Sequence, residues 1–311
     1  MTETKQPATA EAAAEARGGA RGGARGGATA EARGEQAPTL LRRHAAGTES
    51  ARSVLFTVLG ELVLPTGGEA WTSAFIDVFG RLGVEEKAAR QALMRTAADN
   101  WLSSERVGRR TVWRLTPAAE RLLRDGTERI FGFTAVAEDW DGRWTIVIAR
   151  TPETERAARH MIRTRLRWAG FGQVLPGVWI SPRGDRGAEV RQILQEARLP
   201  DGYLFAAEYQ GGGSPAAMVG NAWDLDELTG AYDEFIHAFT GPVSPDPLAR
   251  VIDLVHAWRR FPWIDPGLPA QFLPAPWSGT AAAKLFARRH AEWADEAIAE
   301  WKQLLFLGTS A

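Results

Sequence analysis

The amino-acid sequence predicts an α+β protein with an N-terminal winged helix-turn-helix domain, a central ferredoxin-like α/β domain and a C-terminal helical domain. Residues 73–115 have the pattern of two helices, a short glycine turn and a two-stranded hairpin with a basic tip. Residues 140–209 alternate strand and helix patterns, and the chain beyond residue 218 is helical. With 311 residues, the chain is long enough for two or three domains that each have a hydrophobic core.

The first 38 residues differ from the rest of the chain in composition. They are rich in alanine and glycine, with a tandem Ala-Arg-Gly-Gly unit at 16–19, 20–23 and 24–27. Such a segment buries too little apolar surface to offset the entropy of ordering, so we expect a disordered tail over residues 1–38. The repeat is similar to a nucleic-acid-binding Arg-Gly box, but it has no aromatic residues and its glutamates balance its arginines. A functional role and a low-complexity extension both stay open.

The winged helix-turn-helix domain is predicted over residues 39–133. Its first helix covers about 50–64 and its second begins near Trp71, and both place apolar residues on one face. A turn at Gly83 leads to a third helix over 85–100, in which an apolar residue recurs every four positions. The residues expected to pack together are Val54, Leu55, Val58, Leu59, Leu62, Phe75, Val78, Phe79, Leu82, Ala89, Leu93 and Ala97.

A hairpin and a fourth helix complete this domain. Residues 102–115 alternate in polarity and are punctuated by glycine, which is typical of two antiparallel strands. Thr116 suits the N-cap of the next helix and Pro117 its first position, because proline lacks the N–H that a first turn leaves unpaired. We expect this helix to reach Phe131.

The ferredoxin-like domain is predicted over residues 134–215 and the helical domain over 216–311. In the former, a β-α-β and then α-β order indicates the fold, with strands at 144–148, 178–180 and 203–209 and helices at 153–169 and 189–198. Residues 211–215 form the linker. In the latter, a proline-aromatic stretch at 261–277 interrupts the helices, and the last helix carries Leu285, Phe286, Trp293 and Trp301.

The third helix of the first domain has the residues of a DNA-reading helix. At about 100° per residue, Gln91 and Arg95 lie almost opposite the buried Leu93, and Lys87 flanks them. Glutamine can pair bidentately with adenine and arginine with guanine. Arg90 lies only about 60° from Leu93, so it either contacts a phosphate or braces the helix through a carboxylate.

The tip of the hairpin is basic. Arg106, Arg109 and Arg110 surround Gly108 in a turn where no apolar packing would favour them. We therefore expect them to contact phosphates or the minor groove, which orients a protein on DNA more than it specifies sequence. The charge along the chain agrees: residues 39–133 hold 14 basic and 11 acidic side chains, whereas residues 134–240 hold 11 and 15. Chance variation would also explain that polarity.

Composition and spacing exclude several classes of protein. The chain has no cysteine, which excludes disulfides and thiolate metal sites, and no apolar run long enough to cross a bilayer. A secretory signal pattern is missing, so the expected location is cytoplasmic. No catalytic constellation and no cofactor motif are found. The five histidines lack metal-ligand spacing, so no metal site is expected at His44, His160, His237, His256 or His290.

The motifs of the chain, taken in order, resemble the PaaX family of bacterial repressors. The first is Gly83-Val84 followed by Arg90 and Arg95. The others are Trp101-Leu102, Gly108-Arg109-Arg110, Trp113-Arg114-Leu115-Thr116, Arg129-Ile130-Phe131, Trp140-Asp141-Gly142-Arg143-Trp144 and Arg259-Arg260-Phe261-Pro262. The resemblance covers about residues 50–301. One departure is Glu85, which stands where the family often has serine or asparagine as N-cap; its charge favours the helix dipole but its side chain caps less well.

The resemblance implies a homodimeric repressor that binds double-stranded operator DNA and contains the three domains described above. It further implies control of phenylacetate catabolism and release from DNA by phenylacetyl-coenzyme A. A regulator of the same build that controls another pathway, such as secondary metabolism, through a different small-molecule effector is the alternative.

A metal-dependent nuclease is a further alternative, because the central domain resembles the small ferredoxin-like nucleases of CRISPR systems. Those enzymes place a metal-binding aspartate at the end of the first strand. Here the strand ends Ile148-Ala149-Arg150, and the nearby Asp139 and Asp141 precede it in a turn where aspartate is common for structural reasons. We therefore do not expect an enzyme.

An aromatic and basic run in the C-terminal domain is the candidate effector site. An aryl-acyl thioester needs an apolar slot and cations for its phosphates, and Trp258, Arg259, Arg260 and Trp263 supply both. Phe261 and Trp277 lie nearby. We expect a pocket between the central and C-terminal domains, while packing of these aromatic side chains inside the helical domain stays the alternative.

Overall fold

The computed structural model describes residues 50–136, 140–151, 155–197, 199 and 202–310. All of them belong to one compact unit, Ala37–Ala311. The tail predicted over residues 1–38 and His44 lie outside the described residues, as do Asp139 and the predicted start of a helix at Glu153. The predicted α+β class with its three domains is confirmed.

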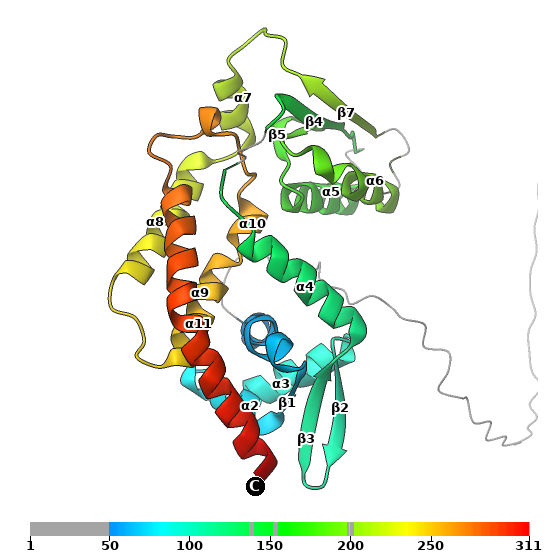
Figure 1. The fold of residues 1–311 in the computed structure, drawn as a ribbon. Coiled ribbons are helices and arrows are strands. Elements are labelled where there is room, and N and C mark those ends of the chain that lie inside the picture. Colours follow the sequence, from blue (N-terminus) through cyan, green and yellow to red (C-terminus); the bar gives the residue numbers. More distant parts are fainter. Residues whose placement is uncertain (1–49, 137–139, 152–154, 198, 200–201, 311) are drawn as a thin grey trace, which may run out of the picture. The chain divides into compact units, whose positions relative to one another are not determined.

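The first domain begins with three helices that form the helix-turn-helix (Figure 1). Helix α1 (Ala51–Val58) continues as a π-helical turn over Leu59–Val63 and a 3-10 turn over Leu64–Thr66. Helices α2 (Thr72–Arg81) and α3 (Glu86–Ala98) are joined at Gly83, whose φ of 72° is a conformation that glycine adopts without strain. The predicted core residues are buried, except that Leu82 and Ala97 are half-buried.

The wing is a three-stranded sheet rather than the predicted two-stranded hairpin. Strands β2 (Leu102–Val107) and β3 (Arg110–Leu115) form the expected pair, and the short strand β1 (Glu69–Trp71) adds to the other edge of β3. Gly108 has a φ of 61° in the two-residue turn between β2 and β3. Helix α4 follows over Pro117–Phe131, as predicted, and the Thr116 hydroxyl accepts a hydrogen bond from the Ala119 N–H at 3.2 Å.

The central domain has the predicted ferredoxin-like topology with one more strand than the sequence pattern predicted. Its sheet order is β5-β6-β4-β7, with every neighbouring pair antiparallel. Strand β5 is the one that was missed. The elements are β4 (Arg143–Ile148), α5 (Arg156–Trp168), β5 (Gly172–Leu175), β6 (Val178–Ser181), a 3-10 turn over Gly184–Arg186, α6 (Gly187–Glu196) and β7 (Tyr203–Glu208).

Helices cover both faces of this sheet. Helices α5 and α6 pack on one face through Ile162, Leu166 and Val190, and α7 (Pro215–Ala222) covers part of the other. The approach of α7 is close, since a Cβ atom at Gly172 would lie 2.6 Å from side-chain atoms of Ala222 and Trp223. Glycine at the start of β5 is therefore what allows α7 to dock.

The C-terminal domain is a set of helices with an aromatic core. Helix α8 covers Leu225–Thr240, α9 Pro247–Trp258, α10 Phe261–Ile264 and α11 Ser278–Ser310, and a 3-10 turn lies at Ala270–Phe272. Helix α11 packs along α8 and α9 and reaches the first domain, where Trp301 is buried in the same core as Phe75 (Figure 1). Among the described residues, no helix combines the length and the apolar character needed to span a membrane.

Candidate functional site

The exposed face of α3 gathers the side chains that the sequence assigned to DNA. Lys87, Arg90, Gln91 and Arg95 are all exposed, while Ala89 and Leu93 on the opposite face are fully buried. Together with Glu86 and Met94, the four exposed side chains line a shallow depression on the surface. The helix thus presents donors and acceptors outward, as a reading helix in the major groove requires.

Arg90 is braced by a carboxylate and remains exposed. Its Nε donates to Glu86 Oε1 at 2.7 Å, one helical turn away, and both side chains are 58% exposed. An exposed pair of this kind contributes only about 0.3–0.5 kcal/mol, so a phosphate could displace Glu86 at little cost.

Met94 is a member of this face that the sequence analysis missed. Its side chain is 63% exposed, whereas Ala89, Ala92 and Leu93 of the same helix are buried. It lies three and four positions from Gln91 and Arg90, so all three share one side of α3. An apolar side chain among polar readers can contact the methyl group of thymine. Its position outside the four-residue apolar repeat was the signal that could have revealed it.

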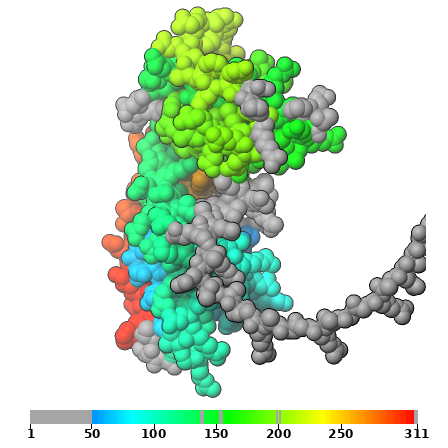
Figure 2. All heavy atoms as spheres, turned by 90° about the vertical axis from the view of Figure 1, so that its right-hand side faces the viewer, coloured from blue at the N-terminus to red at the C-terminus, as the bar shows by residue number. Residues whose placement is uncertain are grey.

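The three wing arginines differ in their surroundings. Arg109 is exposed at the tip and forms no ion pair with any residue that the structure describes. The Arg106 Nε donates to the Gly108 carbonyl at 3.3 Å, and the Arg110 guanidinium lies 5.9 Å from the centre of the Trp71 ring. The hairpin protrudes from the surface at the bottom of Figure 2. Arg106 and Arg109 are exposed, and Arg110 is half-buried.

A neighbouring arginine pairs with two glutamates of the wing sheet. Arg114 on β3 donates to Glu69 on β1 at 2.7 Å and to Glu105 on β2. These hydrogen bonds, the one to Glu105 first, raise the pKa of Arg114. Because Glu105 is neutralised in this way, it opposes the positive charge of the wing less than its place in the sequence suggests.

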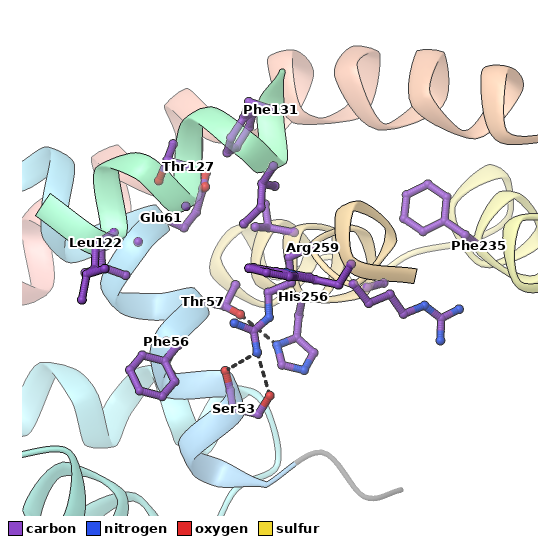
Figure 3. Close-up of a pocket in the computed structure, with 18 of the residues that line it drawn as sticks. Ser53, Phe56, Thr57, Glu61, Leu122, Thr127, Phe131, Phe235, His256 and Arg259 are labelled. Carbon is purple, nitrogen blue, oxygen red and sulfur yellow. Dashed lines mark hydrogen bonds between the residues drawn. The ribbon is translucent and has the colours of Figure 1, made fainter. Parts of the chain in front are cut away.

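A cavity of about 480 Å³ lies between α1 and α4 of the first domain and α8, α9 and the start of α10 (Figure 3). Such a volume suits a small organic ligand. The lining is mostly apolar, with Phe56, Leu122, Leu123, Ile130, Phe131, Phe235, Phe239 and Val255. The Nε1 of Trp101, a nearly fully buried side chain in the lining, has no hydrogen-bond partner among the described residues.

A half-buried arginine stands in this cavity. Figure 3 shows Arg259 directed at Ser53, where its Nη2 donates to the hydroxyl at 2.7 Å and to the carbonyl at 3.1 Å. Burial lowers the pKa of Arg259 to about 10. No carboxylate in the described part of the chain forms an ion pair with it. A partly desolvated cation without a counter-charge is costly, and an anionic ligand would offset that cost.

Polar pairs also contribute to the cavity wall. Thr57 Oγ1 and His256 Nδ1 are hydrogen-bonded at 2.8 Å, and Glu61 Oε1 lies 2.6 Å from Nε2 of His290 on α11. Both pairs join α1 and its continuation to C-terminal helices. The cavity therefore lies where a ligand would touch both domains at once.

Three of the four predicted effector residues line the cavity, and one does not. Arg259, Arg260 and Trp263 line the cavity, with Arg260 exposed at its edge. Trp258 does not: it is buried in the aromatic core, where its Nε1 donates to the Ile130 carbonyl at 3.1 Å. The cavity also lies elsewhere than expected, against the first domain. A separate cavity of about 370 Å³ occupies the expected place between central and C-terminal residues.

The central domain shows what the aspartate before β4 does. Asp141 Oδ1 accepts a hydrogen bond from the Arg143 N–H at 2.9 Å, which is a turn-stabilising contact. Strand β4 ends at Ile148, followed by Ala149 and Arg150. Within the described ranges, no group of three or more histidine, aspartate or glutamate side chains is placed to hold a metal ion.

Comparisons with known proteins agree with this architecture. Three family models match successive segments: "PaaX-like protein" over residues 50–119, "PaaX protein central Cas2-like domain" over 137–219 and "PaaX-like protein C-terminal domain" over 223–303. The transcriptional repressor PaaX of Escherichia coli strain K12 is 29% identical over 265 residues, which are 80% of this chain and 82% of that protein.

A solved structure is similar as well. The uncharacterized protein Rv0674 from Mycobacterium tuberculosis is 26% identical with a TM-score of 0.54, and the match covers 80% of this chain and 98% of that one. The three family models follow one another in the order of the three domains of the fold. The chain belongs to the PaaX family.

Proposed function

We propose that this protein is a homodimeric, ligand-controlled transcriptional repressor that acts in the cytoplasm. It binds double-stranded operator DNA through α3 and the β2–β3 wing. The observation that carries the proposal is the exposed row of Lys87, Gln91 and Arg95 on a helix whose other face is buried, beside an arginine-tipped wing. The name of the Escherichia coli relative, a transcriptional repressor, supports it.

In this proposal the two elements have different tasks. Gln91 and Arg95 contact base edges, with Lys87 and Arg90 on the flanking phosphates. Arg106, Arg109 and Arg110 hold the backbone or the minor groove. Two protomers meet inverted half-sites whose centres are about 10–10.5 bp, or a multiple, apart.

Two alanine variants test this division. Arg95→Ala should cost about 1–3 kcal/mol on the operator and relax the preference for its bases. Arg109→Ala should weaken operator and random DNA alike and make the salt dependence of log Kd shallower by about one unit. Fluorescence anisotropy with both DNAs, over a series of salt concentrations, measures these effects.

Arg124→Ala serves as the control for these variants, because Arg124 is an exposed arginine on α4, outside both elements. It should bind both DNAs like the unmodified protein. If Arg95→Ala and Arg109→Ala lose the same affinity for the operator and for random DNA, the assignment of separate tasks is wrong.

We infer that the effector is an acyl-coenzyme A thioester of the phenylacetyl type and that its acyl group occupies the cavity of about 480 Å³. The apolar lining and the half-buried Arg259 support this. Because the cavity contacts α1 and α4 as well as the C-terminal helices, a ligand can favour one arrangement of the first domain. A preference of about 1–3 kcal/mol for the DNA-incompetent state changes affinity 5- to 150-fold.

Filling the cavity should abolish release from DNA. A Cβ atom at Gly126, which lines the cavity on α4, would meet no other atom within 4 Å, so Gly126→Leu is expected to fit without strain. The loss of a helical glycine should also stabilise α4 by about 0.5–1 kcal/mol. Operator binding should persist, and phenylacetyl-coenzyme A should no longer release the DNA.

The matched control is Gly230→Leu. Gly230 is a helical glycine of α8 with equally open surroundings, outside the cavity lining. This variant should keep normal release in a gel-shift titration with the thioester. Normal release from Gly126→Leu as well would place the acyl group elsewhere.

A regulator of another pathway with a different small-molecule effector is the second candidate, since the cavity lining specifies an apolar anion rather than one compound. Binding of a panel of acyl thioesters and free aryl acids, ranked by affinity, separates the two. A nuclease is the remaining alternative, suggested by the "Cas2-like" description of the central domain. Against it stands the lack of a carboxylate at Ile148-Ala149-Arg150.

A further inference from the structure

The cavity of about 370 Å³ joins residues of all three domains. One wall is the end of α4 with the residues that follow it, from Glu128 to Val136. The other walls are Arg183 and Asp185 of the central domain and Gly267 of the C-terminal domain. These residues are far apart in the sequence, so only the tertiary fold brings them together.

Two arginines line this cavity, and a third lies beside it. Arg129 and Arg183 line it, and Arg186 is close enough to act electrostatically on both. Arg186 is paired with Glu189 at 3.2 Å and with Asp185 at 3.7 Å. In the part of the chain that the structure describes, Arg129 and Arg183 have no carboxylate within 4.0 Å.

Neutral groups contact these two arginines instead. The Arg129 Nη2 donates to the Pro262 carbonyl at 3.2 Å, and the Arg183 Nε donates to the Pro266 carbonyl at 3.3 Å. The Nε atoms of Arg129 and Arg186 are buried and have no hydrogen-bond partner among the described residues. Donors are therefore left over at this site, and unsatisfied buried donors are costly.

The electrostatics favour an anion here. Burial and the positive charges of Arg186 and Arg183 together lower the pKa of Arg129 to about 10, although Glu189 and Asp185 act in the opposite direction. Burial and Arg186 lower the pKa of Arg183 in the same way. The opposing carboxylates are already engaged or exposed. Glu189 pairs with Arg186, and Asp185 is 72% exposed at its side chain. The oxygens of the buried Asp265 accept hydrogen bonds from Tyr232 and the Gly267 N–H.

The loop at Gly267 fixes Arg183 in this position. Gly267 has a φ of 65°, and a Cβ atom there would lie 2.7 Å from Arg183 Nη2. Any other residue would displace the guanidinium, so the loop and the arginine fit each other only through glycine. The site is thus held by close packing rather than by flexible surface side chains.

We propose that Arg129, Arg183 and Arg186 form a binding site for a phosphate ester. Arginine presents planar, forked donors that match phosphate oxygens, and a phosphate ester can accept from the arginine Nε atoms that have no partner here. Arg129 also stacks on Trp263, with its guanidinium 4.0 Å from the ring centre. Since Trp263 lines the larger cavity, the stacked pair separates the phosphate site from the apolar one.

The two neighbouring cavities suggest how one ligand could occupy both, and this step rests on the proposed function. A ligand with an apolar acyl end and a phosphorylated end can place one end on each side of the Arg129–Trp263 pair. Both cavities use the last turns of α4, which closes the DNA-binding domain. The assignment of the phosphate site does not depend on whether one ligand spans both cavities.

The test uses the full chain and a probe that carries phosphate esters but no acyl group. Adenosine 3′,5′-bisphosphate should bind in titration calorimetry, and Arg183→Gln and Arg129→Gln should each weaken it about tenfold or more, as loss of a charge-assisted hydrogen bond predicts. Gly267→Ala should weaken it through displacement of Arg183. Arg143→Gln, which removes an exposed arginine of the same domain, should bind the probe normally.

The outcomes separate this proposal from the proposed function. Inorganic phosphate is titrated in parallel, and if it binds while the bisphosphate does not, the site takes a free ion and the ester assignment is overturned. Equal affinity in all variants, or no binding to the unmodified protein, also overturns it. Operator affinity without ligand, measured on the same folded variants, should stay unchanged; a protein that binds no DNA refutes the repressor but leaves the phosphate test intact.

Discussion

Replacing Trp301 by alanine is expected to destabilise the N-terminal domain by about 3–5 kcal/mol, although Trp301 lies near the end of the C-terminal helix α11. Its side chain is fully buried in the core that α1, α2 and α3 share. The indole packs edge-on against Phe75, with ring centres 6.1 Å apart, and its Nε1 donates to Thr66 Oγ1 at 3.0 Å. The substitution removes the buried area and that hydrogen bond, and it leaves a cavity.

Urea unfolding followed by circular dichroism measures this effect, and Leu307→Ala is the control. Leu307 lies on the same helix and is 63% exposed, so its loss should change the free energy of unfolding by less than about 0.5 kcal/mol. A cost for Trp301→Ala no larger than that of Leu307→Ala would mean that α11 does not support the first domain.

The dependence on Trp301 means that the N-terminal domain does not have a core of its own. Leu248, Val251 and Ile252 of α9 are buried in the same cluster. Arg81 at the end of α2 adds a polar link, since it pairs with Asp246 of α9 at 3.0 Å and with Glu300 of α11. The C-terminal helices α9 and α11 therefore pack directly on α2, which the turn at Gly83 joins to α3.

The elements that the sequence predicted well are those whose signals are local. The apolar repeat of α3, the turn at Gly83 and the Thr116-Pro117 start of α4 depend on neighbouring residues, and the structure confirms them. Strands β1 and β5 were missed because three and four residues are too short for an alternating pattern. Each exists because a neighbouring strand supplies its hydrogen bonds: β3 pairs with β1, and β6 pairs with β5.

The candidate sites also differ in whether local sequence or the tertiary fold determines them. Helical geometry alone placed Gln91 and Arg95 opposite Leu93, so the exposed face of α3 was predictable. By contrast, Arg129 and Arg183 line the same cavity only because α4, the central domain and the loop at Gly267 fold together. In the aromatic run, the sequence could not separate Trp258 from Trp263, since their burial depends on which helices pack against each one.

The second large effect is expected from Tyr232→Phe, which should cost about 1.5–3 kcal/mol at pH 8. The Tyr232 hydroxyl donates to Asp265 Oδ2 at 2.5 Å, and both side chains are buried. Phenylalanine keeps the stacking on Phe261, whose ring centre lies 4.1 Å away, so the change isolates the hydroxyl. In the variant, the buried carboxylate of Asp265 has lost one of its hydrogen-bond donors.

The cost should depend on pH, and its sign follows from Asp265. Burial raises the pKa of Asp265 to about 6 from 3.8, even though the bonds from Tyr232 and Gly267 and the charge of Arg183 lower it. The stability that this group contributes is therefore present below about pH 4 and lost as the pH rises through about 6. Without the hydroxyl the folded pKa rises further, so the variant goes on losing stability above pH 6.

Urea unfolding of both proteins at pH 5 and pH 8 tests this expectation. At pH 5, where the folded carboxyl is mostly protonated, the difference should shrink to about 1 kcal/mol, the value of a neutral hydrogen bond. Tyr203→Phe, at a position 57% exposed on β7, should cost nearly nothing at either pH. A cost for Tyr232→Phe that stays constant, or falls as the pH rises, would show that Asp265 is not the group that the hydroxyl stabilises.

Because Asp265 also accepts from the Gly267 N–H at 2.6 Å, the same variant should loosen the loop that holds Arg183, and so weaken binding of adenosine 3′,5′-bisphosphate.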